Sequence, residues 1–303
     1  GAYGAAIYAK GICHNQREHT RSSMLSRDEL ENFQHESRPV VCKGCTNHCN
    51  LTVNTFAGGE RYISGNRCEK PLGLGKDKEL PDMYRYKLDQ IRALSEQCAA
   101  DAAAHKRHRG VIGLPLGLNM YENLFFWVAF FHSLDFDLVI SDISSRQLYA
   151  KGQYSVPSDT ACYPAKLMHG HVQTLIDEGV KTIFYPCMSY NLDEKLGDNH
   201  YNCPVVAYYP EVIAANVGDA AKITLIHDYL GLHRKRDFPV KAHAMLNQYF
   251  DGITLKEVKK AAKAAYEEYY GYFEKVRARG EEILETAEKQ GREIIVLAGR
   301  PTM

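Results

Sequence analysis

The chain has 303 residues, of which 45% are hydrophobic and 24% are charged. This length favours two structural units or one large α/β unit with an appendage, and the composition excludes collagen, a coiled coil and a disordered tail. The 37 basic residues balance the 37 acidic ones, so no net field would attract nucleic acid or an anionic membrane. The longest apolar stretch, residues 124–131, is far too short to cross a bilayer, and the first residues do not resemble a secretion signal. We therefore expect a cytoplasmic protein with neither nucleic acid nor membrane as a partner.

Residues 1–38 differ in composition from the rest of the chain. Residues 1–10 are predicted to form a glycine turn and a short helix, and the stretch from there to Arg38 is polar and rich in charge. A domain rarely begins with such a helix followed by a long polar run. We interpret residues 1–38 as the tail of an upstream domain and a linker.

Residues 39–75 are predicted to form a small β-hairpin with cysteines at both ends. Residues 51–56 and 62–64 are β-prone, and Gly58 and Gly59 form a turn between them. A unit of about 35 residues cannot bury enough apolar surface to be stable by itself. We therefore expect a metal to stabilise this unit.

Residues 76–303 show an α/β pattern, and we expect this unit to be truncated at its C-terminal end. Helices are predicted over residues 80–104 and 121–134. Short strands are predicted over residues 110–115, 137–141, 182–186, 204–207 and 293–298. Strands that alternate with helices are typical of a doubly wound, mostly parallel sheet, whose ligands bind outside the carboxyl ends of the strands.

The clearest helix is predicted over residues 254–290. Thr254 and Glu257 form a capping box, and apolar residues recur at spacings of three and four, which predicts one buried face. Gly271 and Gly280 weaken the pattern of a single unbroken helix.

The cysteines are the main candidates for chemistry. They are Cys13, Cys42, Cys45, Cys49, Cys68, Cys98, Cys162, Cys187 and Cys203. Their number is odd, four of them fall within 27 positions, and no secretion signal precedes them. Metal-binding thiolates in a reducing compartment explain this pattern better than disulfides do. We assign no role to Cys13 or Cys98.

The strongest motif is C-x2-C-x3-C at Cys42, Cys45 and Cys49, followed by Cys68. Gly44 permits a tight turn that can place three sulfurs around one metal centre, and the hairpin returns the fourth sulfur from Cys68. Four thiolates can hold either zinc or a 4Fe-4S cluster, and a close triad with one remote ligand favours the cluster. A zinc ion that only stabilises the fold is the alternative.

Cys162, Cys187 and Cys203 form a second and looser set. Cys162 begins a helical stretch, Cys187 follows the predicted strand 182–186, and Cys203 precedes the predicted strand 204–207. In a doubly wound sheet, Cys162 and Cys187 could meet at one crevice, and Cys203 could join them. Three thiolates on a 4Fe-4S cluster would leave one iron open for substrate, but buried free cysteines are also common core residues. The residues alone leave both alternatives open.

The remaining polar residues supply no complete catalytic set. His169 and His171 lie two positions apart, so a helix places them on different sides and we do not expect them to bind a metal together. We interpret His48 as a neighbour of the first cysteine set rather than a ligand. No phosphate-binding loop or Ser-His-Asp arrangement is evident, so enzymatic activity is left open.

Four segments of the chain together resemble a known family. They are residues 38–49 (RPVVCKGCTNHC), 65–70 (GNRCEK), 159–166 (DTACYPAK) and 201–206 (YNCPVV). Over about residues 36–301 the chain resembles the large activase-related proteins of the 2-hydroxyacyl-CoA dehydratase system, in their uncharacterised CoA-enzyme-activase domain. Residues 1–10 are also similar to the last helix of the acetate and sugar kinase/Hsp70/actin-type ATPase domain that precedes it.

This resemblance implies an anaerobic, oxygen-sensitive setting in which an ATP-driven activator delivers a low-potential electron to a dehydratase-like component. Dehydratase subunits of this superfamily hold a 4Fe-4S cluster by three cysteines, and Cys162, Cys187 and Cys203 are the positions that could correspond. The implied partners are flanking ATPase domains of the same polypeptide, a dehydratase-type or electron-transfer protein, and a CoA thioester. The ATP-binding signatures lie outside this sequence, and the superfamily's second α/β domain would start near Glu293.

Two hypotheses follow for function. In the first, the chain is an iron-sulfur redox module of a multidomain activase-like protein, and its cysteines relay an electron during ATP-coupled reduction. In the second, the chain is a non-catalytic scaffold or interaction domain whose first cysteine set binds zinc to fold the hairpin. An isolated CoA-thioester dehydratase is disfavoured, because no general acid or base stands out.

Overall fold

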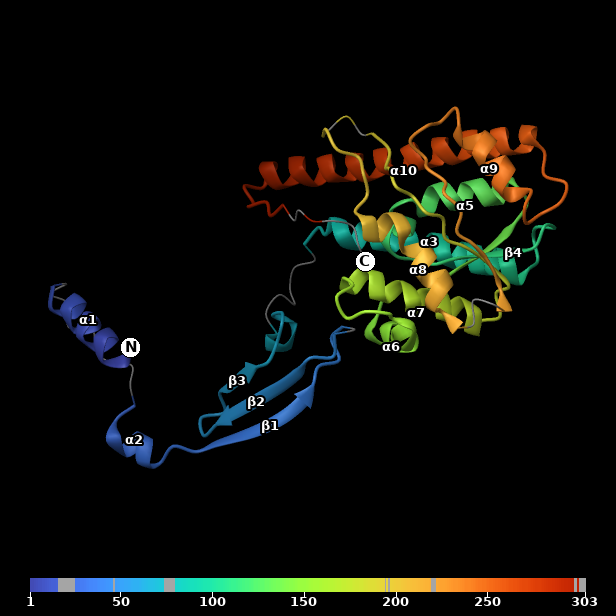
Figure 1. The fold of residues 1–303 in the computed structure, drawn as a ribbon. Coiled ribbons are helices and arrows are strands. Elements are labelled where there is room, and N and C mark those ends of the chain that lie inside the picture. The colour runs from blue at the N-terminus through green and yellow to red at the C-terminus, as the bar shows by residue number, and fades with distance from the viewer. Residues whose placement is uncertain are drawn as a thin grey trace. The chain divides into compact units, whose positions relative to one another are not determined.

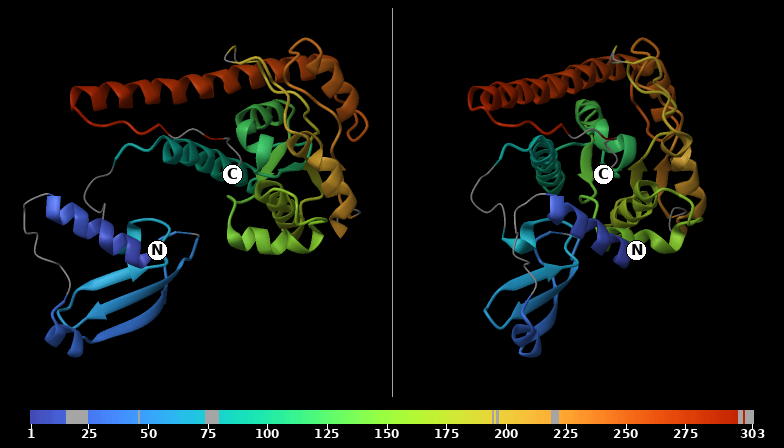
Figure 2. Two further views of the ribbon diagram at one scale, coloured as in Figure 1. Left: turned by 60° about the vertical axis from the view of Figure 1, so that its left-hand side comes forward. Right: turned by 90° about the vertical axis from the view of Figure 1, so that its left-hand side faces the viewer.

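The structure is a computed structural model. It describes residues 1–15, 25–45, 47–73, 80–193, 195, 197–218, 222–296 and 299. These residues divide into two compact units, Gly1–Lys78 and Glu79–Met303, whose elements are shown in Figures 1 and 2. Each unit is described separately below.

The first unit contains a three-stranded antiparallel sheet. Within its described residues, helices α1 (Ala2–Asn15) and α2 (Arg27–Glu31) precede the sheet, and the 3-10 helix η1 (Lys70–Leu72) follows it. The strands are β1 (His35–Val41), β2 (Asn50–Phe56) and β3 (Arg61–Ser64), in the order β1-β2-β3. The predicted N-terminal helix and the predicted hairpin of β2 and β3 are confirmed.

Strand β1 was not among the predicted elements. Its sequence contains three charged or titratable side chains and Pro39, which argue against a strand in the middle of a sheet. The structure places β1 at the edge, where proline is tolerated, and pairs Pro39 with Thr52 of β2. The predicted linker therefore contains most of a strand.

The sheet of the first unit has almost no apolar core. Leu51 is the only buried residue among those that the structure describes in this unit, and every residue of β1 is exposed. The rings of Phe33, His35 and Phe56 form a small cluster with centroids 5.7 to 6.3 Å apart. This amount of burial is too small to offset the conformational entropy of ordering the sheet.

The second unit is built on a four-stranded parallel sheet. Its strands are β4 (Val111–Leu114), β5 (Asp137–Ile140), β6 (Thr182–Phe184) and β7 (Thr224–Ile226), in the order β5-β4-β6-β7. All of the pairings are parallel, which confirms the predicted α/β class. After β5 the chain crosses to the opposite side of β4, so the order reverses between β4 and β6. This reversal is the topological switch point, where ligands of such sheets bind.

Helices cover both faces of this sheet. Those that the structure describes are α3 (Met83–Ala103), α4 (Leu118–Glu122), α5 (Leu124–Ser133), α6 (Arg146–Gly152), α7 (Tyr163–Asp177), α8 (Pro204–Asn216), α9 (Phe238–Leu246), α10 (Leu255–Lys289) and the 3-10 helix η2 (Gln153–Ser155). Trp127 of α5 packs on Phe184 of β6 with ring centroids 4.7 Å apart. On the other face, Leu175 of α7 lies 3.2 Å from where a Cβ on Gly113 of β4 would be.

The core of the second unit is aromatic. Phe126 of α5 is fully buried, and its ring centroid lies 5.0 Å from Trp127, 5.2 Å from Phe238 and 4.9 Å from Tyr266. Helix α5 thus lies between the sheet and α10, as Figure 2 shows. This packing supplies the hydrophobic burial that the first unit lacks.

Helix α10 confirms the prediction for residues 254–290. The capping box of Thr254 and Glu257 is present, with the Thr254 hydroxyl accepting from the Glu257 main-chain N–H at 3.2 Å. The helix continues without a break through Gly271 and Gly280. Its buried face ends at Tyr272, and none of its later residues is buried.

Two predicted strands are wrong in the described residues. Residues 204–207 form the first turn of α8, because Cys203 caps the helix and Pro204 suits its first position. Residues 293–296 are not a strand, since they pair with none of the described strands, and Ile295 is 93% exposed. Residues 297–298 of that prediction lie outside the described residues. The short strand β7 was not predicted.

Helices α6 and α7 meet through main-chain atoms. A Cβ on Gly152 of α6 would collide with the main chain of Gly170 of α7, and a Cβ on Gly170 would collide with the carbonyl of Leu148. Both positions therefore require glycine. This Gly152–Gly170 contact fixes α7, the helix that begins after Cys162, against α6.

Candidate functional site

The first cysteine set is brought together by the register of the small sheet. Cys42, Cys45 and Cys49 lie in the connection between β1 and β2, and Cys68 follows β3. Val41 pairs with Asn50 at this connection, and the last residue of β3 pairs with Thr52 near the start of β2. The main-chain N–H of Cys42 also donates to the carbonyl of Cys49 at 2.9 Å. All four cysteines therefore emerge at the same end of the sheet.

Gly65 brings the segment of Cys68 against this end. Its φ is 81°, and a Cβ there would collide with the carbonyl oxygen of Asn50 at the start of β2. Only glycine allows the chain to turn so close to the neighbouring strand. The side chain of Asn66 then donates to the carbonyl of Cys68 at 3.0 Å, which holds the turn.

The thiols of this set are accessible. Cys42, Cys45 and Cys49 are half-buried and Cys68 is exposed. The Gly44 N–H donates to the Cys42 sulfur at 3.4 Å, as the predicted tight turn requires. Across the part of the chain that the structure describes, no three Cys, His, Asp or Glu side chains are arranged closely enough to hold a metal ion. The strands of the predicted module are present, and its metal site stays a prediction.

The second set centres on a cavity of about 430 Å³ in the second unit. Cys162 and Cys203 both line it, and each is the N-cap residue of a helix, α7 and α8 respectively. The other lining residues are Leu118, Asn119, Glu122, Pro164, Asn191, Tyr201, Asn202 and Val206. Asn119 follows strand β4 and Asn191 follows strand β6, so the cavity lies beyond the carboxyl ends of the two strands that flank the switch point.

Cys187 does not line this cavity. It is 1% exposed and lies after β6, where its main-chain N–H donates to the carbonyl of Asp228 at 3.0 Å. Burial raises the pKa of the Cys187 thiol to about 11, and the nearby charge of Glu211 adds to the shift. The structure therefore brings Cys162 and Cys203 to one cavity and places Cys187 in the packed interior.

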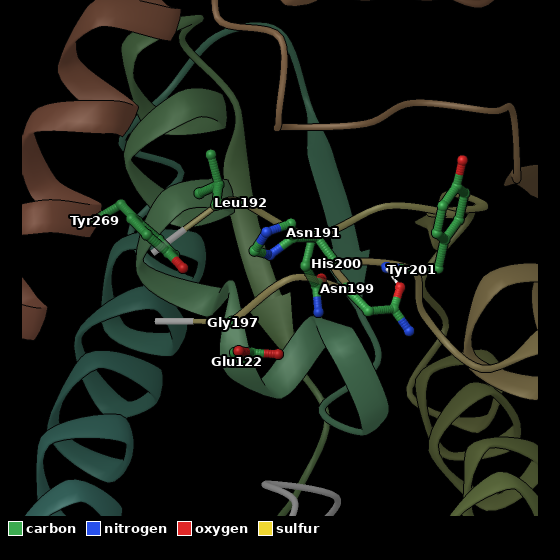
Figure 3. Close-up of a pocket in the computed structure, with 8 residues that line it drawn as sticks. All are labelled: Glu122, Asn191, Leu192, Gly197, Asn199, His200, Tyr201 and Tyr269. Carbon is green, nitrogen blue, oxygen red and sulfur yellow. Dashed lines mark hydrogen bonds between the residues drawn. The ribbon is translucent and has the colours of Figure 1, made fainter. Parts of the chain in front are cut away.

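A smaller cavity of about 240 Å³ adjoins the same region and is shown in Figure 3. It shares Glu122, Asn191 and Tyr201 with the larger cavity, and Tyr269 of α10 also lines it. Asn199 accepts from the main-chain N–H of Tyr201 at 3.1 Å, the dashed line in Figure 3. Both cavities are therefore lined by Glu122 of α4 on one side and by Asn191 and Tyr201 on the other.

Asn119 is a site residue that sequence reasoning missed. It is 3% exposed, and neither its Oδ1 nor its Nδ2 has a hydrogen-bond partner among the residues that the structure describes. The preceding Leu118 has a φ of 48°, which is unusual for a residue with a branched side chain. Its position at the start of the helix that follows β4, a strand at the switch point, was the available signal.

His169 and His171 are structural residues of α7. Both are fully buried, and burial lowers the pKa of His169 to about 4 and that of His171 to about 3. His169 contacts Ser155 at 2.8 Å and Tyr209 at 3.1 Å, whereas His171 contacts Ser141 at 2.8 Å. The two imidazoles serve different hydrogen-bond networks, on different sides of the helix as predicted.

The second unit thus belongs to the broad class of α/β proteins with a ligand-sized cavity at the switch point of a parallel sheet. Residues 111–302 match the model of the CoA enzyme activase uncharacterised domain, and since this is more than half of the chain, the chain belongs to that family. The family part of the resemblance is confirmed. The matched region includes Cys162, Cys187 and Cys203.

Other comparisons give no further relatives. No curated protein matches the chain, and no solved structure matches it. Among the helices that the structure describes, none has the length and apolar character needed to span a membrane.

Proposed function

We propose that this chain is the iron-sulfur redox module of a CoA-enzyme-activase-like protein. It would support ATP-coupled, low-potential electron transfer to a 2-hydroxyacyl-CoA dehydratase-type system in the cytoplasm of an anaerobic cell. Membership of the activase family supports the activase-like part of this proposal. The observation that carries the proposal is the register of the small sheet, which brings Cys42, Cys45, Cys49 and Cys68 to one end.

The donor chemistry of this end fits a metal centre. Four thiols with no apolar cover are a ligand set for a 4Fe-4S cluster or for zinc. A bound 4Fe-4S cluster would supply one-electron transfer at low potential. Main-chain N–H groups such as that of Gly44, which already donates to the Cys42 sulfur, would tune this potential. The accessible thiols would leave a route for electrons from flanking ATPase domains of the same polypeptide.

A second centre in the cavity is a narrower part of this proposal. Cys162 and Cys203 would contribute thiolates there, because each caps the N-terminus of a helix, whose dipole favours negative charge. The cavity would admit part of a substrate, of which a CoA thioester is the candidate. Cys187 would have to move from its buried position to join them, so its role as third ligand stays a prediction.

The proposal is tested by iron and acid-labile sulfide analysis of the whole chain prepared without oxygen. We expect both elements, with a brown colour, and we expect Cys45→Ser to remove the iron and sulfide of the first centre. Cys203→Ser would separately remove those of the second. Cys98→Ser is the matched control, because Cys98 is buried and belongs to neither cysteine set. Colourless protein without iron or sulfide after reconstitution would contradict the proposal.

A zinc-stabilised scaffold is the second candidate, and one observation favours it. The sheet of the first unit has a single buried residue, Leu51, among its described residues, so a structural metal of any kind would supply most of its stability. Elemental analysis separates the candidates. One zinc per chain without visible absorption, together with loss of amide protection in β1 to β3 on chelation, would favour the scaffold.

A further inference from the structure

A straight row of exposed side chains runs along helix α10. Its members follow one another at spacings of three and four residues, which places them on one line of a helix. This line lies opposite the buried face, to which Val258 and Ala265 belong, and the second half of the helix extends beyond α5 (Figures 1 and 2). The row, called here the α10 ridge, has ten members, all of them exposed: Lys256, Lys260, Lys263, Glu267, Tyr270, Glu274, Ala278, Glu281, Glu285 and Glu288.

The charges of the α10 ridge are separated by sign. Its first three members are lysines and its last three are glutamates. Like charges three or four residues apart destabilise a helix, so this order works against the stability of α10 by itself. Within the described chain, only two of these six side chains form ion pairs, Lys263 with Glu267 at 3.8 Å and Glu285 with Lys289 at 3.5 Å, and both pairs are exposed. The separation by sign therefore points to a partner outside α10.

The order of the charges is complementary to itself when two copies of the ridge run antiparallel. If a twofold axis lies at the level of Tyr272, each of the three lysines of one copy faces a glutamate of the other. The pairs are Lys256 with Glu288, Lys260 with Glu285, and Lys263 with Glu281, and the symmetry repeats each of them. Two ridges that run parallel and in register would instead place lysine against lysine and glutamate against glutamate.

The centre of the ridge adds contacts that are not ion pairs. Tyr270 is 40% exposed and would lie opposite Glu274 of the other copy, to which its hydroxyl can donate. The Nζ of Lys235 lies 4.3 Å from the centroid of the Tyr270 ring and fixes that ring on the surface. A surface hollow of about 550 Å³ is lined by Tyr270 and by Gly271, whose missing side chain leaves room for a second helix.

We propose that the α10 ridge is an interaction surface for a second copy of this chain, whose own α10 packs on it antiparallel. Exposed ion pairs contribute little singly and are screened by salt, so the dimer is weak and dissociates at high ionic strength. The charges act mainly by fixing the direction and register of the two helices. This inference goes beyond the proposed function, because it requires neither a metal nor a ligand.

Zero-length coupling of lysine to glutamate tests this register. The whole chain is treated with a carbodiimide at low salt, and the linked peptides are identified by mass spectrometry. We expect dimers that carry a Lys256–Glu288 link. These two residues are roughly 48 Å apart within one α10, at 1.5 Å per residue, so the link can form only between two copies. A chain that sediments as a monomer at low salt, dimers without this link, or links from the ridge lysines to acidic residues of Gly1–Lys78 would overturn the proposal.

Two charge-reversed variants assign the dimer to this surface. In one variant the three lysines of the ridge are replaced (Lys256→Glu, Lys260→Glu and Lys263→Glu), and in the other the last three glutamates are replaced (Glu281→Lys, Glu285→Lys and Glu288→Lys). We expect each variant alone to self-associate at least tenfold more weakly than the wild type in sedimentation at low salt. An equimolar mixture of the two should dimerise again, because every reversed charge then faces an opposite one.

The matched control exchanges charges on α10 away from the ridge. Glu268→Lys with Lys275→Glu leaves the net charge unchanged, both positions are exposed, and the dimer should persist. Self-association that survives in either ridge variant, or a mixture that stays monomeric although both variants melt as the wild type does, would overturn the proposal. If a ridge variant does not fold, the carbodiimide links of the wild type decide.

Discussion

The two sheets of this chain differ in what covers them. In the second unit, helices pack on both faces, and the rings of Phe126 and Trp127 are fully buried. In the first unit, Leu51 is the only buried residue within the described part, and four cysteines lie in the segments at one end of the sheet. The second sheet is therefore stabilised by its own side chains, whereas the first depends on main-chain geometry and, in our proposal, on a metal.

The largest effect is expected from a change to the aromatic core. Phe126→Ala removes a fully buried ring that packs on Trp127, Phe238 and Tyr266, so the second unit should lose about 3–5 kcal/mol of its free energy of unfolding. Denaturant unfolding followed by hydrogen exchange measures the loss for each unit. Amide protection in β1 to β3 should not change. If amide protection in β1 to β3 fell as well, the two sheets would not be stabilised independently, which would contradict this prediction.

A smaller effect is expected at the turn that positions Cys68. Gly65 and Gly59 both have a φ of 81°, but only a Cβ on Gly65 would collide with a neighbouring strand. Gly59→Ala should cost the first unit about 1–2 kcal/mol for its backbone conformation alone, and Gly65→Ala should cost more and also weaken metal binding. Hydrogen exchange of β2 and β3, with metal titration, measures both. Equal costs at the two positions would show that the close approach to Asn50 does not matter.

The smallest effect concerns the start of α10. Hydrogen bonds from the side chain and main chain of Thr254, and then from Arg109, lower the pKa of Glu257 to about 2 from 4.5. A lowered carboxyl pKa stabilises the fold above pH 4.5, and this contribution is lost as the pH falls toward 2. Glu257→Gln should therefore be slightly less stable than the wild type at pH 7, with the difference vanishing near pH 2. Denaturant unfolding of both proteins between pH 2 and pH 7 measures this difference, and a difference that does not change with pH would contradict the prediction.

Local signals in the sequence predicted the elements that depend on local interactions. The capping box at Thr254 and the turn at Gly58 and Gly59 both specify their structure within a few residues, and both predictions are confirmed. Strand β1, by contrast, depends on its antiparallel pairing with β2 rather than on a local sequence signal. The strand prediction for residues 204–207 followed from Val205 and Val206, whereas a proline at the first helical position decided the outcome.

The residues of the candidate site also fall into two groups, those that local sequence signals identified and those whose surroundings depend on tertiary packing. The spacing of the cysteines and their places at the ends of elements identified Cys162 and Cys203, which both line one cavity. The burial of Cys187 depends on the packing of residues distant in sequence, including Asp228. Nothing in the sequence around Asn119 distinguishes a free amide from a satisfied one, because that difference arises only when the neighbouring helices are in place.

The Gly152–Gly170 contact has a consequence for how this cavity can be altered. Side chains at an interface can change rotamer to admit a larger neighbour, but two main chains in direct contact have no such freedom. A methyl group added at Gly170 would push α7 away from α6 and shift the thiol of Cys162 with it, although the two residues lie far apart along the helix. New binding specificity must therefore arise from the residues that line the cavity, because the contact between α6 and α7 at Gly152 and Gly170 tolerates no added side-chain atom.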